Sequence, residues 1–375
     1  MTPRSEAELA EAIAAAAGPL AVRGGGTRPV GRRVEGEILS AAGLDGITLY
    51  EPGALTLVAR AGTPLAMIED ALAAENQRLP FEPMDHRPLL GTDGVPTIGG
   101  AVAANVSGPR RIQAGSCRDS LIGVRFVDGA GRVLKNGGRV MKNVTGYDLV
   151  KLMAGSRGTL GVLSEVSFKV LPVPEATATL RLAGLSPARA VAALSAALTS
   201  PFEVSGAAHS PVRDETLIRV EGFAESVAYR GGRLADLLGR FGDITVEEDP
   251  ARAGDIWRRV RDVTDLADRT GDVWRISVRP GDGPRIAAAL GEVPGGAECL
   301  YDWGGGLIWA QVAQGADIRP TLAQIPGHAT LVRAGEDTRR NLAVFPPEPA
   351  PLAAISAGLR AKFDPRGILN PGLMG

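Results

Sequence analysis

The stretch PLAVRGGGTRPVG, residues 19–31, joins a short apolar run to three consecutive glycines that have an arginine on either side. The apolar run predicts a buried strand that ends at the glycines. Backbone N–H groups in a glycine turn at the end of a strand can bind an anion, and a diphosphate is a common anion of this kind. The stretch therefore predicts a pyrophosphate-binding turn with Arg23 and Arg28 as counter-charges, an ordinary surface turn being the alternative.

The glycines do not match the two most common nucleotide-binding motifs. A GxGxxG frame that starts at Gly24 needs glycine at position 29, where Pro29 stands. No Gly-Lys-Ser/Thr follows Gly31, so the sequence has no P-loop here. The usual modes of NAD and ATP binding are therefore disfavoured.

The composition is that of a folded globular protein. The chain has 375 residues, of which 45% are hydrophobic and 22% charged, enough for one large or two ordinary domains. Lys and Arg number 41 against 42 Asp and Glu, so the net charge gives no reason to expect a nucleic-acid partner. No window holds the roughly 18 to 20 uninterrupted apolar residues of a membrane span. We expect no direct membrane span, and a small molecule or another protein as partner.

The two cysteines, Cys117 and Cys299, stand far apart and form no CxxC or Cys/His cluster. Neither a structural zinc site nor a cysteine-ligated iron–sulfur cluster can be built from them, so we predict no metal site. Two isolated thiols are typical of a reducing compartment. We therefore expect a cytoplasmic protein, attached to the inner face of a membrane only through partner subunits.

Strands and helices alternate over the first hundred residues. A possible capping box of Ser5 and Glu8 begins an alanine-rich helix. GITLYEPGALTLVARAG (46–62) predicts two strands around a Pro-Gly turn, and RLPFEP (78–83) predicts a short strand. TPLAMIEDALAAENQ (63–77) predicts a helix with Thr63 as its cap and Pro64 at its first position.

Three further segments are rich in small residues. They are GTDGVPTIGGAVAANVSG (91–108), GSCRDSLIG (115–123) and GSRGTLGV (155–162), each next to a predicted strand. Small residues at this density let another group approach the backbone closely. A long dinucleotide such as FAD needs several such approaches, so the four segments together favour FAD over an isolated turn.

The remaining pattern divides the chain into three parts. DSLIGVRFVDGAGRVLKNGG (119–138) predicts a β-hairpin, and residues 147–175 predict a short helix, a glycine turn and a long strand closed by prolines. We predict a first domain over 1–175, a smaller α+β domain over 176–334, and a C-terminal segment over 335–375. The Pro-rich FPPEPAP (345–351) leads to a last helix near 353–363.

The order of these motifs resembles a known family. The glycine loop, PTIGGAVAANVSG, SCRDSLIGVRFVDGAGRV, GGRVMKNVTGYDLVKLMAGSRGTLGVLSEVSFKVLP and FDPRGILNPG are similar to the FAD-binding domain of vanillyl-alcohol oxidase, D-lactate dehydrogenase and glycolate oxidase. The likeness is strongest to the FAD-binding (E) subunits of bacterial glycolate oxidase, where it includes VWRISV, YDWGGGL and GHATLVRAG of the second domain. The resemblance implies an α/β to α+β fold: a two-lobed FAD-binding domain of the PCMH type, a smaller cap domain, and a C-terminal segment that returns to the FAD domain.

The resemblance also implies which residues bind FAD. The pyrophosphate loop, the ribityl segment, the segment that closes over the flavin and the turn at the adenine side together give Gly24, Gly25, Gly26, Thr27, Thr97, Ile98, Gly99, Gly100, Ala104, Asn105, Gly108, Asp119, Gly158, Gly161 and Val162. Val106 and Ser107 differ from the residues that many members have there. Many relatives link the flavin covalently through a histidine near the glycine loop, but the histidines here are His86, His209 and His328. We expect non-covalent FAD.

The resemblance implies a subunit of a larger oxidoreductase. Relatives that oxidise hydroxy acids directly carry a glycine-asparagine-histidine segment and further cap histidines, which this chain lacks, so we assign no catalytic residue. The expected function is the FAD-binding subunit of a glycolate (2-hydroxy acid) oxidase or dehydrogenase of glyoxylate metabolism. Its expected partners are a catalytic flavin subunit and an iron–sulfur subunit that passes electrons toward quinone. The alternatives are a self-sufficient dehydrogenase with His328 or a tyrosine as base, and a flavin-free assembly scaffold.

Several other residues have two interpretations. Three arginines could face FAD phosphates or an acidic partner, or could form a solvated basic surface: Arg110, Arg111 and Arg118. Asp148 is expected to cap the helix that follows it. Trp274 and Trp303 could shield a flavin, but core packing is the preferred interpretation. Cys117 is expected to be an unreactive small residue.

Overall fold

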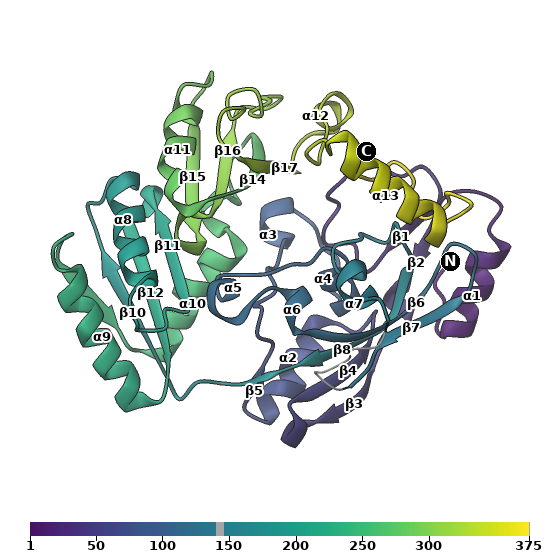
Figure 1. The fold of residues 1–375 in the computed structure, drawn as a ribbon, viewed down its shortest axis with the longest axis horizontal. Helices are drawn as coiled ribbons and strands as arrows, with labels where there is room; N and C mark the ends of the chain where they lie inside the picture. Colours follow the sequence, from purple (N-terminus) through teal and green to yellow (C-terminus); the bar gives the residue numbers. More distant parts are fainter. Residues whose placement is uncertain (140–145, 375) are drawn as a thin grey trace.

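The computed structural model describes residues 1–139 and 146–374. Residues 140–145, which belong to the motif GGRVMKNVTG, lie outside this described part. Figure 1 shows two large β-sheets, each with its own helices, and a C-terminal segment that lies on the same side of the molecule as the N-terminal strands. The mixture of antiparallel sheets and helices agrees with the α+β class predicted from the sequence.

The first sheet has five antiparallel strands in the order β3-β4-β8-β6-β7. Helices α2, α4 and α7 cover one face, where Phe126 is buried, and α1 packs on the other face against Val127. The predicted hairpin of β6 and β7 is confirmed, with Val127 opposite Val133. The bounds are β3 (Ile47–Glu51), β4 (Thr56–Arg60), β6 (Leu121–Val127), β7 (Val133–Gly137), β8 (Val162–Lys169), α1 (Glu6–Ala15), α2 (Leu65–Ala74), α4 (Ile98–Ala103) and α7 (Leu149–Met153).

A small parallel pair, β1 (Leu20–Arg23) and β2 (Glu37–Ser40), stands beside this sheet, and the glycine-rich loop leaves from the end of β1. The C-terminal segment joins the pair. The Leu20 N–H donates to the Ile368 carbonyl at 2.7 Å, and Leu20 forms a β-bridge with Leu369. The segment follows α12 (Glu336–Asn341) and α13 (Ala350–Phe363). The two ends of the chain therefore form one structural unit (Figure 1).

The second sheet has eight antiparallel strands in the order β13-β10-β12-β11-β15-β16-β14-β17. Its first half packs against α8 and α9 through residues such as Leu180 and Ile218, and α11 packs on its second half through Ile286. The bounds are β10 (Ala176–Leu182), β11 (Gly206–Ser210), β12 (Glu215–Gly222), β13 (Ile244–Glu247), β14 (Asp272–Val278), β15 (Ala297–Asp302), β16 (Leu307–Val312), β17 (Gly327–Arg333), α8 (Pro187–Leu198), α9 (Ala224–Leu238), α10 (Pro250–Asp262) and α11 (Gly283–Gly291).

Short elements lie between the two sheets. They are α3 (Arg87–Leu90), α5 (Arg111–Ala114), α6 (Cys117–Ser120) and the pair β5 (Gln77–Arg78) with β9 (Leu171–Pro172). The change from one sheet to the other falls between β9 and β10, and this supports our proposed division at residues 175 and 176. We keep the full division, 1–175, 176–334 and 335–375, as a proposal.

A buried ion cluster holds the two sheets together. The Arg219 guanidinium of β12 binds the Glu82 carboxylate at 3.0 Å, and Glu221 of the same strand binds Arg110 at 2.7 Å. Arg110 also binds Glu82 at 2.6 Å, and Arg78 binds Glu221 at 2.9 Å. Three arginines and two glutamates thus connect the five-stranded and eight-stranded parts through alternating charges. Arg110 pairs with acids of the chain itself, so it is neither a phosphate contact nor a solvated surface residue.

Several local predictions can be compared with the structure. Ser5 caps α1 and Asp148 caps α7 by accepting from the Lys151 N–H at 3.1 Å, as predicted. Thr63 does not cap α2, because its hydroxyl donates to the Arg60 carbonyl and Pro64 occupies the cap position. RLPFEP is a strand only at Arg78, because the next residues turn inward and bury Phe81. Within the described part, no helix is both long and apolar enough to cross a membrane.

Candidate functional site

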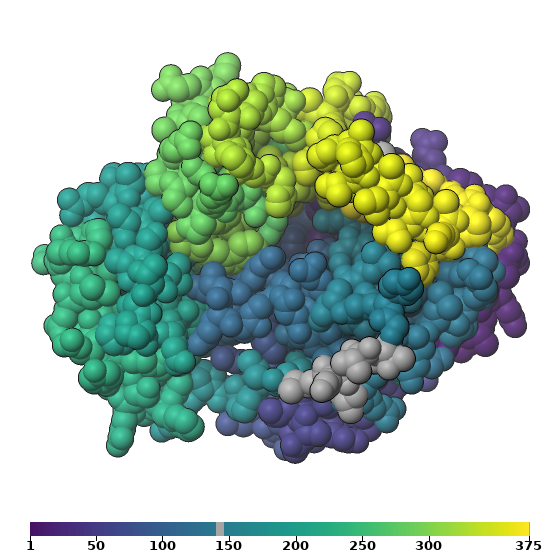
Figure 2. Space-filling view, in the orientation of Figure 1, coloured from purple at the N-terminus to yellow at the C-terminus, as the bar shows by residue number. Residues whose placement is uncertain are grey.

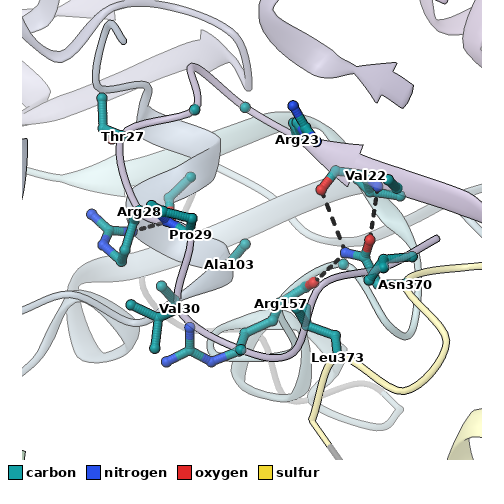
Figure 3. A pocket seen from close by; sticks show the side chains of 18 of the residues that line it. Val22, Arg23, Thr27, Arg28, Pro29, Val30, Ala103, Arg157, Asn370 and Leu373 are labelled. Atoms are coloured by element: carbon teal, nitrogen blue, oxygen red, sulfur yellow. Dashed lines mark hydrogen bonds between the residues drawn. The ribbon is translucent and has the colours of Figure 1, made fainter. Parts of the chain in front are cut away.

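A pocket of about 940 Å³ lies where the glycine-rich loop, the start of α4, the turn after α7 and the C-terminal segment meet. Figure 3 shows this site from close by, with Arg28 extending from the loop and Asn370 bonded to Val22 of β1. Eleven of the fifteen predicted FAD residues line the pocket: Gly24, Gly25, Gly26, Thr27, Thr97, Gly99, Gly100, Ala104, Gly158, Gly161 and Val162. The fold therefore brings three separate small-residue segments to one cavity.

The other four predicted residues do not line this pocket. Ile98 is fully buried in the core of the five-stranded part. Asn105 has φ +47° and accepts a hydrogen bond from the Arg118 N–H, and Gly108 lies against Glu82. Asp119 closes a capping box with Ser116 at the start of α6. These four residues shape the segments that surround the pocket, and their contact with FAD stays a prediction.

The glycines of the loop are fixed by the packing of the chain itself. A Cβ on Gly25 would lie 1.6 Å from the Val95 carbonyl oxygen, and one on Gly24 would lie 2.6 Å from the Thr97 Oγ1. Gly26 has open space around it but adopts φ +76°, which favours glycine. At Gly24 and Gly25 the close approach is thus between two loops, so the bare backbone there does not by itself indicate a ligand.

The turn after α7 is held to β1 by the C-terminal segment. Asn370 Oδ1 accepts from the Val22 N–H at 2.7 Å, and Asn370 Nδ2 donates to the Arg157 carbonyl at 2.8 Å. Gly158 has φ +73°, and a Cβ there would lie 3.1 Å from Asn370 Nδ2. One amide side chain therefore sets the position of the Arg157–Gly158 turn against the glycine-rich loop (Figure 3).

The pocket is strongly basic. Its walls carry seven arginines and two glutamates: Arg23, Arg28, Arg32, Arg33, Arg157, Arg339, Arg340, Glu35 and Glu336. Glu336 is already paired with Arg340 at 2.7 Å. Unpaired guanidinium groups in a cavity attract an anion, and Arg side chains bind phosphate oxygens well.

Arg28 is the clearest unsatisfied cation in the site. Its Nη1 donates to the Gly100 carbonyl at 3.0 Å, and its Nε atom is closed off from solvent without a hydrogen-bond partner among the described residues. Burial, followed by the nearby charge of Arg157, lowers the pKa of Arg28 to about 9. A bound anion would offset both effects, because it supplies an acceptor and an opposite charge.

Arg157 is the second such cation, and the sequence analysis did not single it out. Burial lowers its pKa to about 10, and its guanidinium carbon lies 4.6 Å from the centre of the Phe345 ring. Within the described part, no carboxylate forms an ion pair with it. The signal was present in the sequence, because Arg157 is the charged residue inside the small-residue turn GSRGTLGV.

Arg219 shows how the chain treats a buried arginine that needs no ligand. Burial works against its charge, but the carboxylates of Glu82 and Glu221 raise its pKa above the usual value. Arg28 and Arg157 are less deeply buried than Arg219 and line the pocket, and among the described residues neither forms an ion pair with an acid. An anion in the pocket would supply the opposite charge that Glu82 and Glu221 supply to Arg219.

His86 and Cys117 lie beside the cations of the pocket. His86 is buried, its Nδ1 lies 3.2 Å from the Met84 carbonyl, and burial together with the Arg28 charge holds its pKa well below the ordinary range. Its imidazole is therefore neutral. Cys117 is fully buried and burial raises its pKa, so the thiol stays protonated and unreactive, as predicted.

Two tryptophans have different environments. Trp274 is fully buried in the core of the eight-stranded part, as expected. Trp303 is only partly buried, and its ring carries the Arg111 guanidinium at 4.6 Å and the Arg275 guanidinium at 5.2 Å. Trp303 packs against the core of the eight-stranded part, as expected, but at its edge, where the indole also contacts cations between the two sheets. Arg118 remains exposed.

The comparisons with known proteins agree with this site. Residues 1–137 match the family described as "FAD binding domain". Two solved structures of alkyldihydroxyacetonephosphate synthase have the same fold, and one of them has a TM-score of 0.71 at 16% identity over 99% of this chain and 76% of that chain. The predicted fold class is thereby confirmed, and the family match indicates FAD as the cofactor.

Curated relatives extend the likeness over the whole chain. "D-lactate dehydrogenase" of Archaeoglobus fulgidus is 30% identical over 157 residues, 41% of this chain and 33% of that protein. "Glycolate oxidase subunit GlcD" of Bacillus subtilis is 35% identical over 130 residues, 35% of this chain and 24% of that protein. "Glycolate oxidase subunit GlcE" of Escherichia coli is 39% identical over 360 residues, 95% of this chain and 92% of that protein. The chain belongs to the family of the glycolate oxidase subunit GlcE, within the FAD-binding oxidoreductases.

Proposed function

We propose that this chain binds FAD non-covalently in the basic pocket and is the FAD-carrying subunit of a complex that oxidises glycolate or another small 2-hydroxy acid. The observation that carries the proposal is the pair of pocket-lining arginines, Arg28 and Arg157, which form no ion pair with an acid in the described part of the chain. When bound, FAD would supply a two-electron carrier that receives the electrons of hydroxy-acid oxidation and passes them on.

The residues present fit a dinucleotide. The loop of Gly24, Gly25, Gly26 and Thr27 offers backbone without bulky side chains on one wall, and the start of α4 offers the same on another. The Arg28 Nε–H has no hydrogen-bond partner among the described residues, so the chain does not fully satisfy this guanidinium group. We therefore propose that the fifteen residues predicted from the sequence, together with Arg28 and Arg157, form the FAD site.

The environments of Cys117 and of the three histidines support non-covalent binding. The Cys117 thiol is buried and protonated, so it is a poor nucleophile toward a flavin. The neutral imidazole of His86 is held by the Met84 carbonyl, and His209 lies in the eight-stranded sheet with its Nδ1 3.1 Å from the Glu215 carbonyl. His328 is exposed on β17, opposite Ser277.

The proposed complex contains two further subunits. The relative that covers almost the whole chain is named as a subunit, and we propose that this chain likewise works beside a catalytic flavin subunit and an iron–sulfur subunit. In this arrangement the hydroxy acid is oxidised on the partner flavin subunit, and electrons pass toward quinone. We propose a cytoplasmic location, with attachment to the inner face of the membrane through those partners.

The test is the visible absorption spectrum of the purified chain before and after acid precipitation, followed by anaerobic addition of glycolate. Flavin bands that leave with the acid supernatant and do not bleach with glycolate are the expected result. Bleaching by glycolate would show a self-sufficient dehydrogenase. A chain without flavin, even after FAD is added back, would show a scaffold and overturn the proposal.

A further inference from the structure

Trp303 holds two arginines near each other between the two sheets. Its ring lies 4.6 Å from the Arg111 guanidinium, which comes from α5, and 5.2 Å from the Arg275 guanidinium, which comes from β14. Its indole Nε1 donates to the Gly108 carbonyl at 3.1 Å, and its backbone N–H donates to Asp302 Oδ1 at 2.7 Å. Trp303, a residue of the eight-stranded part, is therefore hydrogen-bonded to Gly108 of the FAD-binding part. Its indole contacts the Arg111 and Arg275 guanidinium groups.

Among the described residues, no hydrogen bond and no ion pair reaches the Arg111 or Arg275 guanidinium. The Asp119 carboxylate acts on Arg111, and the Asp302 carboxyl group on Arg275, only from beyond ion-pair distance. Burial and the charges of Arg111 and Arg157 lower the pKa of Arg275 to about 10. Two guanidinium groups that contact one indole and form no ion pair favour the binding of an anion.

The strand register adds small polar groups on the same face. Arg275 of β14 lies opposite Thr330 of β17, and Ser277 lies opposite His328. Residues opposite one another in an antiparallel pair share a face, and the next residues but one along each strand share it too. A hydroxyl and an imidazole therefore lie diagonally beside the Arg275 guanidinium. Partial desolvation and the charges of Arg275 and Arg111 lower the pKa of His328, which agrees with this proximity.

This group is separate from the pocket of the glycine-rich loop. Neither Arg111 nor Arg275 lines that pocket, and His86 lies close to both places, because the charges of Arg28, Arg157 and Arg275 all act on it. Figure 2 shows the surface hollowed between the green strands of the large sheet, the yellow α13 and the blue segment that follows α3. The hollow gives a route from solvent toward the space between the sheets.

We propose that Arg275 and Arg111 bind the carboxylate of a small 2-hydroxy or 2-oxo acid on this chain, with His328 and Ser277 as neighbouring polar contacts. A carboxylate fits because it accepts hydrogen bonds from two guanidinium groups and needs little space. The proposal rests on the proposed function for the substrate class, but not for the presence of an anion site. The role is binding: no residue here is assigned a proton transfer.

The test is isothermal titration of the full chain with glycolate, glyoxylate, phosphate and chloride at constant ionic strength. We expect glycolate or glyoxylate to bind, and their relative affinities to show whether the site prefers the alcohol or the oxo acid. Binding of phosphate and chloride as strong as that of the carboxylates would overturn the proposal, as would the absence of carboxylate binding. The titration is done with and without added FAD. The flavin spectrum tests FAD binding and the titration tests anion binding, so failure of one proposal is distinguished from failure of the other.

Variants locate the site. Arg275→Gln and Arg111→Gln should each weaken glycolate binding at least tenfold, and Arg275→Lys should restore part of it. Arg279→Gln, an exposed arginine just after the same strand, is the matched control and should bind as the unchanged chain does. Trp303→Phe tests the positioning role: it should weaken binding less than loss of either arginine. Equal affinity in Arg275→Gln, with an unchanged thermal melt, would overturn the proposal.

Discussion

The side-chain oxygen of Asn370 accepts a hydrogen bond from the backbone N–H of Val22 at 2.7 Å, across 348 residues of sequence. The same amide donates to the Arg157 carbonyl at 2.8 Å. Asn370 adopts φ +47°, a conformation that asparagine tolerates better than most residues. Asn370 therefore joins β1, the Arg157 turn and the C-terminal segment at one wall of the pocket.

Asn370→Ala should loosen this wall. The Val22 N–H would lose its partner in a partly buried place, so we expect a loss of about 1–3 kcal/mol in the free energy of unfolding and weaker FAD binding. Asn370→Asp keeps the acceptor for Val22 but replaces the donor to Arg157, so it separates the two contacts. Urea unfolding and FAD titration of both variants make the measurement. Unchanged values in Asn370→Ala would show that the contact is dispensable.

Arg28→Gln should weaken FAD binding more than it weakens the fold. The guanidinium has no acid partner among the described residues, so its loss removes a buried cation that only a ligand satisfies. We expect at least a tenfold rise in the FAD dissociation constant, or about 1.4 kcal/mol. Arg33→Gln, at the exposed mouth of the pocket, is the control and should change binding far less. Equal effects of the two variants would mean that only the overall positive charge matters.

Glu82→Gln should destabilise the connection between the two sheets. Glu82 binds both Arg219 and Arg110, and its neutralisation leaves two buried cations without a full counter-charge. Loss of one partner of a buried pair costs about 3–5 kcal/mol. Glu336→Gln removes an ion pair that is exposed to solvent and should cost far less. Chemical unfolding of both variants measures the difference. A small loss in the free energy of unfolding of Glu82→Gln would show that the buried ion cluster does not hold the two sheets together.

Asp302 should make a contribution to stability that falls as the pH rises from about 4 to about 7, whereas the lowered pKa values of His86 and His209 act in the opposite direction over this range. Burial raises the pKa of Asp302 from 3.8 to about 7, so the folded state holds a proton that the unfolded state has released over this range. The contribution is complete below the lower value and is lost as the pH passes the higher one. Asp302→Asn keeps an acceptor for the Trp303 N–H and removes the titration.

The measurement for Asp302 is the free energy of unfolding at pH 5 and pH 7.5 in both proteins. We expect Asp302→Asn to gain stability relative to the unchanged chain between pH 5 and pH 7.5, by on the order of a few kcal/mol. The same slope in both proteins would place the titration on another group.

Gly25→Ala should destabilise the glycine-rich loop even without FAD. The added Cβ would lie 1.6 Å from the Val95 carbonyl oxygen, so one of the two loops must move. Gly53→Ala is the matched control, because nothing lies within 4 Å of its added Cβ and its φ is not positive. Thermal melts of the flavin-free proteins should separate the two variants. Equal melts would show that the loop adapts at little cost.

The sequence predicted most of the residues that line the pocket, but not the contacts that require glycine or leave an arginine unpaired there. Eleven predicted residues line one pocket because small residues next to strand ends mark places where loops cross closely. The sequence could not show that Gly25 is required by Val95 rather than by a phosphate, since that contact joins loops 70 residues apart. It also gave Arg157 and Arg275 no special status. An arginine becomes informative only when the fold shows which acids are out of reach, and the same holds for Trp303, whose environment comes from two different sheets.

The order in which the chain is synthesised gives the C-terminal contact a further consequence. A ribosome makes β1 and the glycine-rich loop early, but Asn370 and Leu373, which complete the wall of the pocket, are made 348 residues or more after Val22. A nascent chain, or one cut short by a late stop codon, would present the first domain's core without a finished cavity. We therefore expect loading of the pocket that is proposed to bind FAD to follow the synthesis of Asn370 and Leu373.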